Sequence, residues 1–284
     1  MKKMLIGVLL LMVTSQAQIK TMERRYVPIL LHGSQIPRID LAWKEWTAFR
    51  YDRAAGSWRI VPWQVDEVDS NNKYNKEKDG VIDANDEILC MPEDLGDQAM
   101  AFEWLEDPQA RQQPRIELTF TEENDSRKKG WLYLYRHVST DQAPLSYHQR
   151  YSPALAGTAA DTTRTLAYTI GHNRDGWIDF VSLSLSPHTD LVDRLKLRFS
   201  GETVFGGLGK YTCSEDTLNN GSSSYHTGLI RAFHDQRTLF SLPKIWPKPI
   251  NTDYQLEYYP YSFRIGVRSE ERRVGKECRY RRST

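Results

Sequence analysis

The chain has 284 residues, of which 39% are hydrophobic, and its formal net charge is +1. This length is enough for one large β domain or two smaller ones. Three cysteines are too few for a disulfide-stapled scaffold, and the small net charge does not indicate a nucleic-acid partner.

The chain begins with the features of a secretory signal peptide. Two lysines precede the apolar run Met4–Val13, and Ser15 and Ala17 stand at the −3 and −1 positions of a cleavage site. Ten apolar residues are too few to span a bilayer as a helix. We therefore expect residues 1–17 to be removed, the protein to be periplasmic or extracellular, and the mature chain to have no membrane span.

Most of the remaining chain has the alternating apolar and polar pattern of β-strands. In chain order the predicted strands are Tyr26–Leu31, Trp58–Val65, Arg115–Phe120, Gly130–Arg136, Leu166–Ile170, Trp177–Leu185, Arg194–Phe199, Gln255–Tyr259 and Ser262–Gly266. Arg115–Phe120 and Gly130–Arg136 are predicted to pair, because the residues between them are polar and turn-like. Pro62 predicts an edge or a bulge within its strand.

Few helices are predicted. Ala99–Glu106 has a candidate N-cap in Asp97, and a short helix could start after Pro187. The small and polar composition of Ser152–Thr165 predicts a linker, and that of Leu218–Gly228 a flexible loop.

The predicted fold class is therefore mainly β, with antiparallel β-sandwiches and few short helices. We expect a β-rich domain over residues 18–152. A second β-rich unit, or a continuation of the first, is expected over residues 153–267.

The strongest local pattern is the oxygen-rich segment Asn75–Asp86. Oxygen donors stand at alternate positions 75, 77 and 79, Gly80 permits a sharp bend, and Ile82 is suited to anchor the segment in the core. Calcium prefers six to eight oxygen ligands from a tightly folded loop. The same residues also suit a solvated turn in which Asp and Gly serve the backbone.

This segment resembles the twelve-residue calcium loop of EF-hand and dockerin modules. The resemblance covers only this loop, and it implies calcium ligands at Asn75, Glu77, Asp79, Val81, Asp83 and Asp86. The first, third and last positions depart from the motif, with Asn, Glu and Asp in place of the usual ligands. Each departure is expected to weaken calcium binding.

Two further acidic segments are candidate sites. Asp66, Glu67 and Asp69 could act as general acid and base, add oxygens to the same cation, or be ordinary surface charges. The segment Asn173–Asp179 partly repeats the calcium pattern, but it has Gly171 at the first ligand position and favours a β-turn.

Other catalytic patterns are absent from the sequence. The seven histidines include no HExxH pair, and no Gly-x-Ser-x-Gly motif occurs. Cys90 and Cys213 could form one long-range disulfide or remain two buried thiols.

Aromatic residues are frequent, with eight Trp and fifteen Tyr. Exposed aromatic rings can stack on sugar rings, whereas buried ones form a core. Trp43, Trp46, Trp58 and Trp63 are close enough in sequence that we expect one or two of them to be exposed and to form a glycan platform.

Residues 268–284 at the end of the chain are expected to have a different origin. Residues 268–278 resemble a translated sequencing adapter, so we expect the natural sequence to end near Val267 and residues 268–284 to be unstructured. Without the signal peptide and this tail, the basic residues number 38 − 2 − 7 = 29 and the acidic ones 37 − 3 = 34, a net charge of −5. A mildly acidic body argues against a nucleic-acid partner.

These features predict an exported β-sandwich that serves as a binding or structural module of the cell envelope, stabilised by calcium and binding a glycan. The alternative is the N-terminal accessory domain of a polysaccharide hydrolase or lyase. The segment Val61–Asp97 also resembles segments of exported bacterial proteins of uncharacterised family.

Overall fold

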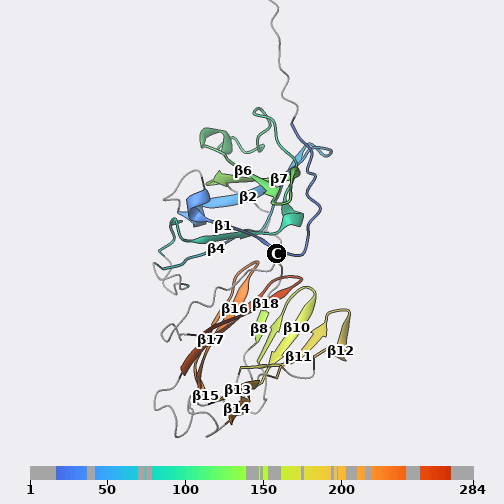
Figure 1. Ribbon diagram of the computed structural model, residues 1–284. Coiled ribbons are helices and arrows are strands. Elements are labelled where there is room, and N and C mark those ends of the chain that lie inside the picture. The colour runs from blue at the N-terminus through green and yellow to red at the C-terminus, as the bar shows by residue number, and fades with distance from the viewer. Residues whose placement is uncertain are drawn as a thin grey trace, which may run out of the picture. The chain divides into compact units, whose positions relative to one another are not determined.

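The computed structural model describes residues 17–36, 42–69, 74, 79–138, 147, 150–152, 161–173, 176–192, 195–196, 198–202, 210–214, 219–240 and 250–269. Within these ranges the protein is mainly β, with antiparallel sheets (Figure 1), which confirms the predicted fold class. The helices described are 3-10 helices of three residues each: η1 (Gly33–Gln35), η2 (Trp43–Glu45), η3 (Pro92–Asp94) and η4 (Ala110–Gln112). No helix in these ranges has the length and apolar character needed to cross a membrane.

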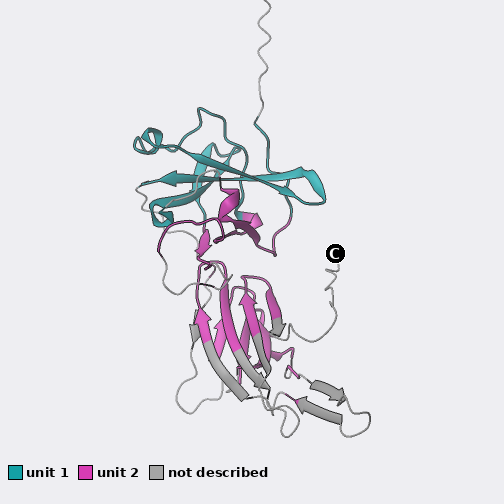
Figure 2. Ribbon diagram, turned by 60° about the vertical axis from the view of Figure 1, so that its left-hand side comes forward, with its two compact units in different colours: residues 1–23, 42–61, 94–143 teal, residues 24–41, 62–93, 144–284 magenta. Residues whose placement is uncertain are grey.

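The chain forms two compact units that alternate along the sequence (Figure 2). Unit 1 consists of residues 1–23, 42–61 and 94–143, and unit 2 of residues 24–41, 62–93 and 144–284. The sequence suggested consecutive domains with a boundary near residue 152. The units interleave instead, because strands that lie far apart along the chain pair with one another.

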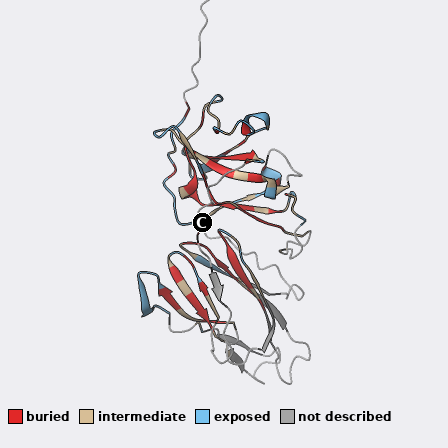
Figure 3. Ribbon diagram, turned by 180° about the vertical axis from the view of Figure 1, so that it is seen from behind, coloured by how far each residue is buried: buried red, intermediate tan, exposed pale blue. Residues whose placement is uncertain are grey.

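Unit 1 is built on one four-stranded antiparallel sheet. Its strands are β2 (Trp46–Asp52), β3 (Ser57–Ile60), β6 (Ile116–Glu122) and β7 (Asp125–Arg136), in the order β3-β2-β7-β6. The predicted hairpin of Arg115–Phe120 with Gly130–Arg136 is confirmed as β6 and β7. Residues 130–135 of β7 are buried on both faces of the sheet (Figure 3), so this strand forms the centre of the unit.

Unit 2 contains three sheets and a two-stranded ribbon. The first sheet has the order β1-β5-β4, with β1 (Ile29–His32), β4 (Gln64–Asp66) and β5 (Glu87–Cys90). The second has the order β12-β11-β10-β9-β8, with β8 (Arg150–Ser152), β9 (Asp161–Arg164), β10 (Tyr168–His172), β11 (Ile178–Leu183) and β12 (Ser186–Asp190). The third has the order β15-β16-β17-β18, with β15 (Asn219–His226), β16 (Ala232–Phe240), β17 (Ile250–Tyr258) and β18 (Phe263–Ser269), and β13 (Arg198–Glu202) pairs with β14 (Lys210–Ser214).

The second and third sheets of unit 2 share one core. Tyr168 and Ile170 from β10 meet Tyr254, Leu256 and Tyr258 from β17 in a single buried cluster. Each of these strands buries alternate residues there, as expected for two sheets packed face to face.

Several predicted elements differ from the structure. Ala99–Glu106 is not helical: residues 101 and 102 form a turn and Ala99 packs into the core of unit 1. The predicted loop Leu218–Gly228 contains β15, which hydrogen-bonds along β16. The predicted helix after Pro187 is instead part of β12. In the last two cases, pairing with the neighbouring strand overrides local composition.

One predicted strand is divided in two. Trp58–Val65 is interrupted after Ile60, and its two parts belong to different units as β3 and β4. The interruption includes Pro62, which cannot donate a ladder hydrogen bond. At the other end, Arg268 and Ser269 extend β18, while residues 270–284 lie outside the described ranges.

Candidate functional site

The predicted calcium loop is described only in its second half. Asn75 and Glu77 lie outside the described residues, whereas Asp79, Val81, Asp83 and Asp86 lie within them. Asp79 and Asp83 are exposed. The two residues expected to shape the loop agree with the prediction. Gly80, at the bend, has a φ of 85°, and Ile82, the core anchor, is fully buried.

The side chain of Asp86 accepts hydrogen bonds from backbone N–H groups of its own unit. Its side chain is buried, and its two oxygens accept hydrogen bonds from Val68 N at 2.9 Å and Asp83 N at 2.7 Å. Burial raises the pKa of Asp86, although these two hydrogen bonds act to lower it. A Cβ on Gly33 would lie 1.7 Å from the Asp83 carbonyl oxygen, so only glycine permits this close approach.

The predicted acidic cluster is also engaged in structural contacts. Glu67 is 5% exposed, and its carboxylate accepts hydrogen bonds from Asp79 N at 2.7 Å and Gly80 N at 3.1 Å. Asp66 is buried beside Arg231. Because both carboxylates are buried and hydrogen-bonded, this arrangement does not favour them as the acid and base of a hydrolase. Among the described residues, no three His, Cys, Asp or Glu side chains are grouped to hold a metal ion.

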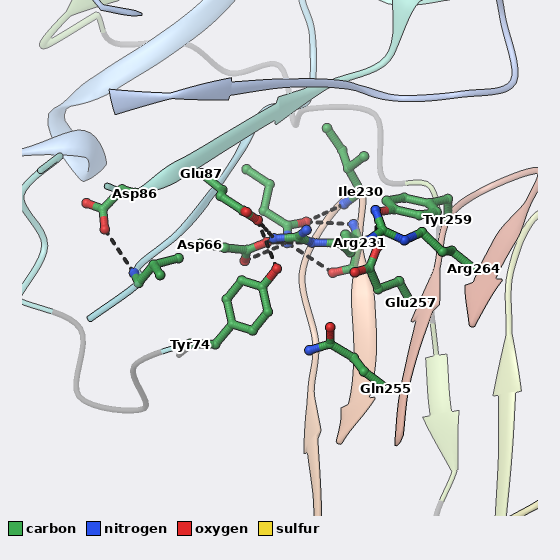
Figure 4. A network of polar contacts seen from close by, with 12 residues as sticks. Asp66, Tyr74, Asp86, Glu87, Ile230, Arg231, Gln255, Glu257, Tyr259 and Arg264 are labelled. Atoms are coloured by element: carbon green, nitrogen blue, oxygen red, sulfur yellow. Dashed lines mark hydrogen bonds and ion pairs between the residues drawn. The ribbon is translucent and has the colours of Figure 1, made fainter. Parts of the chain in front are cut away.

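Arg231 forms the centre of a buried charge network in unit 2 (Figure 4). Its Nη2 lies 2.6 Å from both Asp66 Oδ2 and Glu87 Oε2, and Nε lies 2.9 Å from Asp66 Oδ2. Tyr74 donates to Glu87 at 2.9 Å, and its ring centroid lies 4.9 Å from the guanidinium. Burial acts to lower the pKa of Arg231, but Asp66, Tyr74 and Glu87 together raise it above its ordinary value.

Gln64 extends this network to the backbone. Its Oε1 accepts from Ile230 N at 2.7 Å and Arg231 N at 2.8 Å, while its Nε2 donates to Asp66 Oδ1 at 2.8 Å and to the Arg231 carbonyl at 3.0 Å. The network therefore joins β4 and β5 to the start of β16. Each polar side chain named in this network has a hydrogen-bond or ion-pair partner, as expected for a network that stabilises the fold.

A second polar cluster lies inside the sandwich of unit 2. His172 is fully buried, with Nε2 2.6 Å from Tyr258 Oη and Nδ1 3.7 Å from Asp161 Oδ1. The ring centroid of His234 lies 5.4 Å from that of His172. Burial, followed by the nearby His234, lowers the pKa of His172 to about 4. Burial also lowers the pKa of His234.

The partial repeat of the calcium pattern is a hydrogen-bonded turn. Gly176 N donates to the Asn173 carbonyl at 2.9 Å, and Trp177 N donates to Asn173 Oδ1 at 3.0 Å. Cys90 is buried on β5. The side chain of Cys213 lies outside the described residues, so its pairing with Cys90 stays a prediction.

The four tryptophans considered for a platform are less exposed than predicted. Trp46 is buried, and Trp43, Trp58 and Trp63 are partly buried. Trp46 and its neighbours on β2 fit the core because the central strands of this sheet are covered on both faces. Of the four, Trp58 belongs to a larger aromatic group.

This group, the aromatic–arginine cluster, lies in unit 1 and consists of Trp58, Trp104, Tyr133, Tyr135 and Arg115. The Trp58 ring centroid lies 5.0 Å from that of Tyr133 and 5.4 Å from that of Tyr135, and Trp104 lies 5.8 Å from Tyr135. All three pairs are edge-to-face, a favourable geometry for aromatic rings. The two tyrosines come from β7, Trp58 from β3, and Trp104 from the segment between η3 and η4.

Arg115 lies among these rings. Its guanidinium carbon lies 4.9 Å from the Trp104 ring centroid, 5.1 Å from that of Tyr133 and 5.9 Å from that of Trp58. Arg115, Trp58 and Trp104 are all partly exposed, whereas both tyrosines are buried. The cluster therefore presents two indole rings and a cation near the surface above a rigid aromatic base.

Sequence reasoning identified only one member of this group. Trp58 is a candidate from sequence, whereas the sequence pattern predicts a helix around Trp104 and places Arg115 at one end of a strand. These three residues are too far apart along the chain to form a recognisable sequence motif. One feature of the sequence could have indicated the cluster: Arg115, a large cation, stands at the start of a strand in which apolar and polar residues otherwise alternate regularly.

Comparisons of the chain with protein-family models, curated proteins and solved structures find no match.

Proposed function

We propose that this protein is an exported, mainly β binding module of the cell envelope, and that it binds a glycan through the aromatic–arginine cluster. The observation that carries the proposal is the partial exposure of Trp58, Trp104 and Arg115 over a buried aromatic base. The signal-peptide pattern of residues 1–17 supports export.

The chemistry of the cluster suits a sugar. A sugar ring offers an apolar C–H face that stacks on an aromatic ring, and hydroxyl groups that need hydrogen-bond partners. A binding site of this kind combines aromatic surface with a small number of placed polar groups. Here the indoles of Trp58 and Trp104 supply the surface, and the guanidinium of Arg115 supplies donors.

The proposal is tested by titrating the mature protein with soluble polysaccharides and oligosaccharides of defined composition, using calorimetry and tryptophan fluorescence. Trp104→Ala is expected to weaken binding by about tenfold or more, because a stacked aromatic ring contributes on the order of 1–3 kcal/mol. Trp43→Ala, which removes a partly buried tryptophan outside the cluster, serves as the control and should bind normally. Binding that is unaffected by Trp104→Ala, or absent from every glycan tested, would overturn the proposal.

We also propose that calcium stabilises the Asn75–Asp86 loop, supported by the bend at Gly80 and the buried anchor Ile82. Asp79 and Asp83 are exposed and present oxygens, while the oxygens of Asp86 already accept two N–H groups. Because three positions depart from the motif and the oxygens of Asp86 already accept hydrogen bonds, we expect weak calcium binding, with an affinity like that of extracellular calcium modules.

Calcium is expected to produce measurable heat in calorimetric titration and to raise the melting temperature, because an ion that binds only the folded state stabilises it. Asp79→Ala should remove both effects, whereas Glu123→Ala, which removes an exposed carboxylate from the β6–β7 turn, should retain them. An intact protein that shows neither heat nor a change in melting temperature would exclude this site.

A further inference from the structure

Among the residues that the structure describes, backbone carbonyls accept the hydrogen bonds of the Arg115 guanidinium. Its Nη1 donates to the Glu103 carbonyl at 2.6 Å and its Nη2 contacts the Met100 carbonyl at 3.5 Å. No ion pair joins Arg115 to a carboxylate of the described residues. Arg231, the buried arginine of unit 2, shows the contrast, because two carboxylates lie 2.6 Å from its Nη2.

Glu103, whose carbonyl contacts Arg115, and Glu117, two residues along the chain, have side chains with other partners. Glu103 Oε1 accepts from the Tyr51 hydroxyl at 2.5 Å, and Oε2 accepts from Met100 N at 2.5 Å. Glu117 accepts from Gln98 Nε2 at 3.4 Å. Burial, followed by the hydrogen bond to Glu103, raises the pKa of Tyr51 to about 12, which keeps this hydroxyl a donor to Glu103.

The guanidinium therefore retains donor capacity as well as charge. A guanidinium has five N–H groups in one plane; the carbonyls of Glu103 and Met100 accept two hydrogen bonds from it, and Arg115 also interacts with the Tyr135 hydroxyl. The rings of Trp58 and Trp104 contact its face, which leaves donors at its edge. An arginine edge of this kind recognises a planar or tetrahedral anion through charge-assisted hydrogen bonds.

We propose that the ligand of the aromatic–arginine cluster is an acidic glycan, whose anionic group is bound by Arg115 while the sugar ring stacks on Trp58 or Trp104. This inference rests on the proposed function and specifies its ligand class. The anionic group is a carboxylate, as in a uronic acid, or a sulfate ester. Both present oxygens that match the edge of a guanidinium.

The experiment compares three oligosaccharide probes against the mature protein: oligogalacturonate, the same oligomer with its carboxylates methyl-esterified, and a sulfated galactan oligomer. Oligogalacturonate or the sulfated oligomer is expected to bind at least about tenfold more tightly than the neutral ester, the effect of one charge-assisted hydrogen bond. This preference should diminish as salt is raised. The acidic probe that binds more tightly identifies the anion.

Two variants assign the preference to Arg115. Arg115→Gln should lower the affinity for the acidic probe more than the affinity for the neutral ester, so that the two probes bind equally. Arg115→Lys should keep a reduced preference, because lysine retains the charge without the planar set of donors. Thermal melting reports whether each variant folds. If Arg115→Gln does not fold, the acidic preference is decided by comparing the esterified and acidic probes on the unaltered protein.

The outcomes separate this inference from the proposed function. One outcome is that neutral and acidic probes bind equally and that Trp104→Ala weakens both. This outcome would overturn the acidic preference and leave glycan binding in place. An acidic preference that persists in Arg115→Gln would also overturn the role of Arg115. Absence of binding to all glycans would remove both proposals.

Discussion

Replacing Arg231 with methionine is expected to lower the free energy of unfolding by about 3–5 kcal/mol, the usual cost of removing one partner from a buried ion pair. Arg231 is 1% exposed, and its guanidinium lies 2.6 Å from carboxylate oxygens of both Asp66 and Glu87. Methionine fills a similar volume but leaves two carboxylates without their cation. Urea denaturation followed by circular dichroism measures the loss.

Two further variants test whether uncompensated charge is the cause. Combining Arg231→Met with Asp66→Asn and Glu87→Gln should recover much of the loss, since neutral amides no longer need a buried cation. Arg127→Ala is the control, because Arg127 forms an exposed ion pair with Asp125, and such pairs contribute little. A loss for Arg231→Met no larger than that for Arg127→Ala would contradict the structural role of the network.

Acidification from about pH 6.5 toward about pH 4 is expected to destabilise unit 2 through His172. A histidine in the unfolded chain has a pKa near 6.5, whereas burial and His234 lower the pKa of folded His172 to about 4. Between these values the unfolded chain binds more protons than the folded protein, so the free energy of unfolding falls as the pH falls. The full shift corresponds to about 3 kcal/mol.

Neighbouring charges modify this dependence. Asp161, 3.7 Å from His172, acts to raise the pKa of both buried histidines, and Asp235 also acts to raise that of His234. Asp86 opposes the trend, because its raised pKa means that the folded state takes up its proton more readily. The net slope is therefore expected to be smaller than two independent histidines would give.

The measurement is urea denaturation at a series of pH values between 7.5 and 4. His172→Gln should reduce the slope of stability against pH, whatever its effect on stability at neutral pH. His188→Gln, which changes an exposed histidine on β12, should leave the slope as it is. An unchanged slope in His172→Gln would show that this histidine does not control the acid response.

Local pattern was a reliable guide where apolar and polar residues alternate clearly within each strand. The β6–β7 hairpin was predicted because two alternating runs flank a short polar segment, and the two runs pair directly. Leu218–Gly228 failed as a prediction because its residues are small and polar. They form β15 only through the hydrogen bonds that β16 provides.

The candidate sites show the same distinction. Alternating oxygens around Gly80 identified a bend, and the structure has that bend, but the pattern could not show that Asp86 already accepts two backbone N–H groups. Trp58 was identified by type alone. Its neighbours Trp104 and Arg115 come from another segment, and only folding brings these three side chains into contact.

The sequence by itself determined that this chain forms antiparallel sheets with few helices, because apolar alternation is a property of each strand taken alone. Tertiary structure decided which strands pair, how the two units interleave, and which charged side chains are buried with partners. Those outcomes depend on contacts between residues such as Asp66 and Arg231, and no local pattern records a contact that spans so much of the chain.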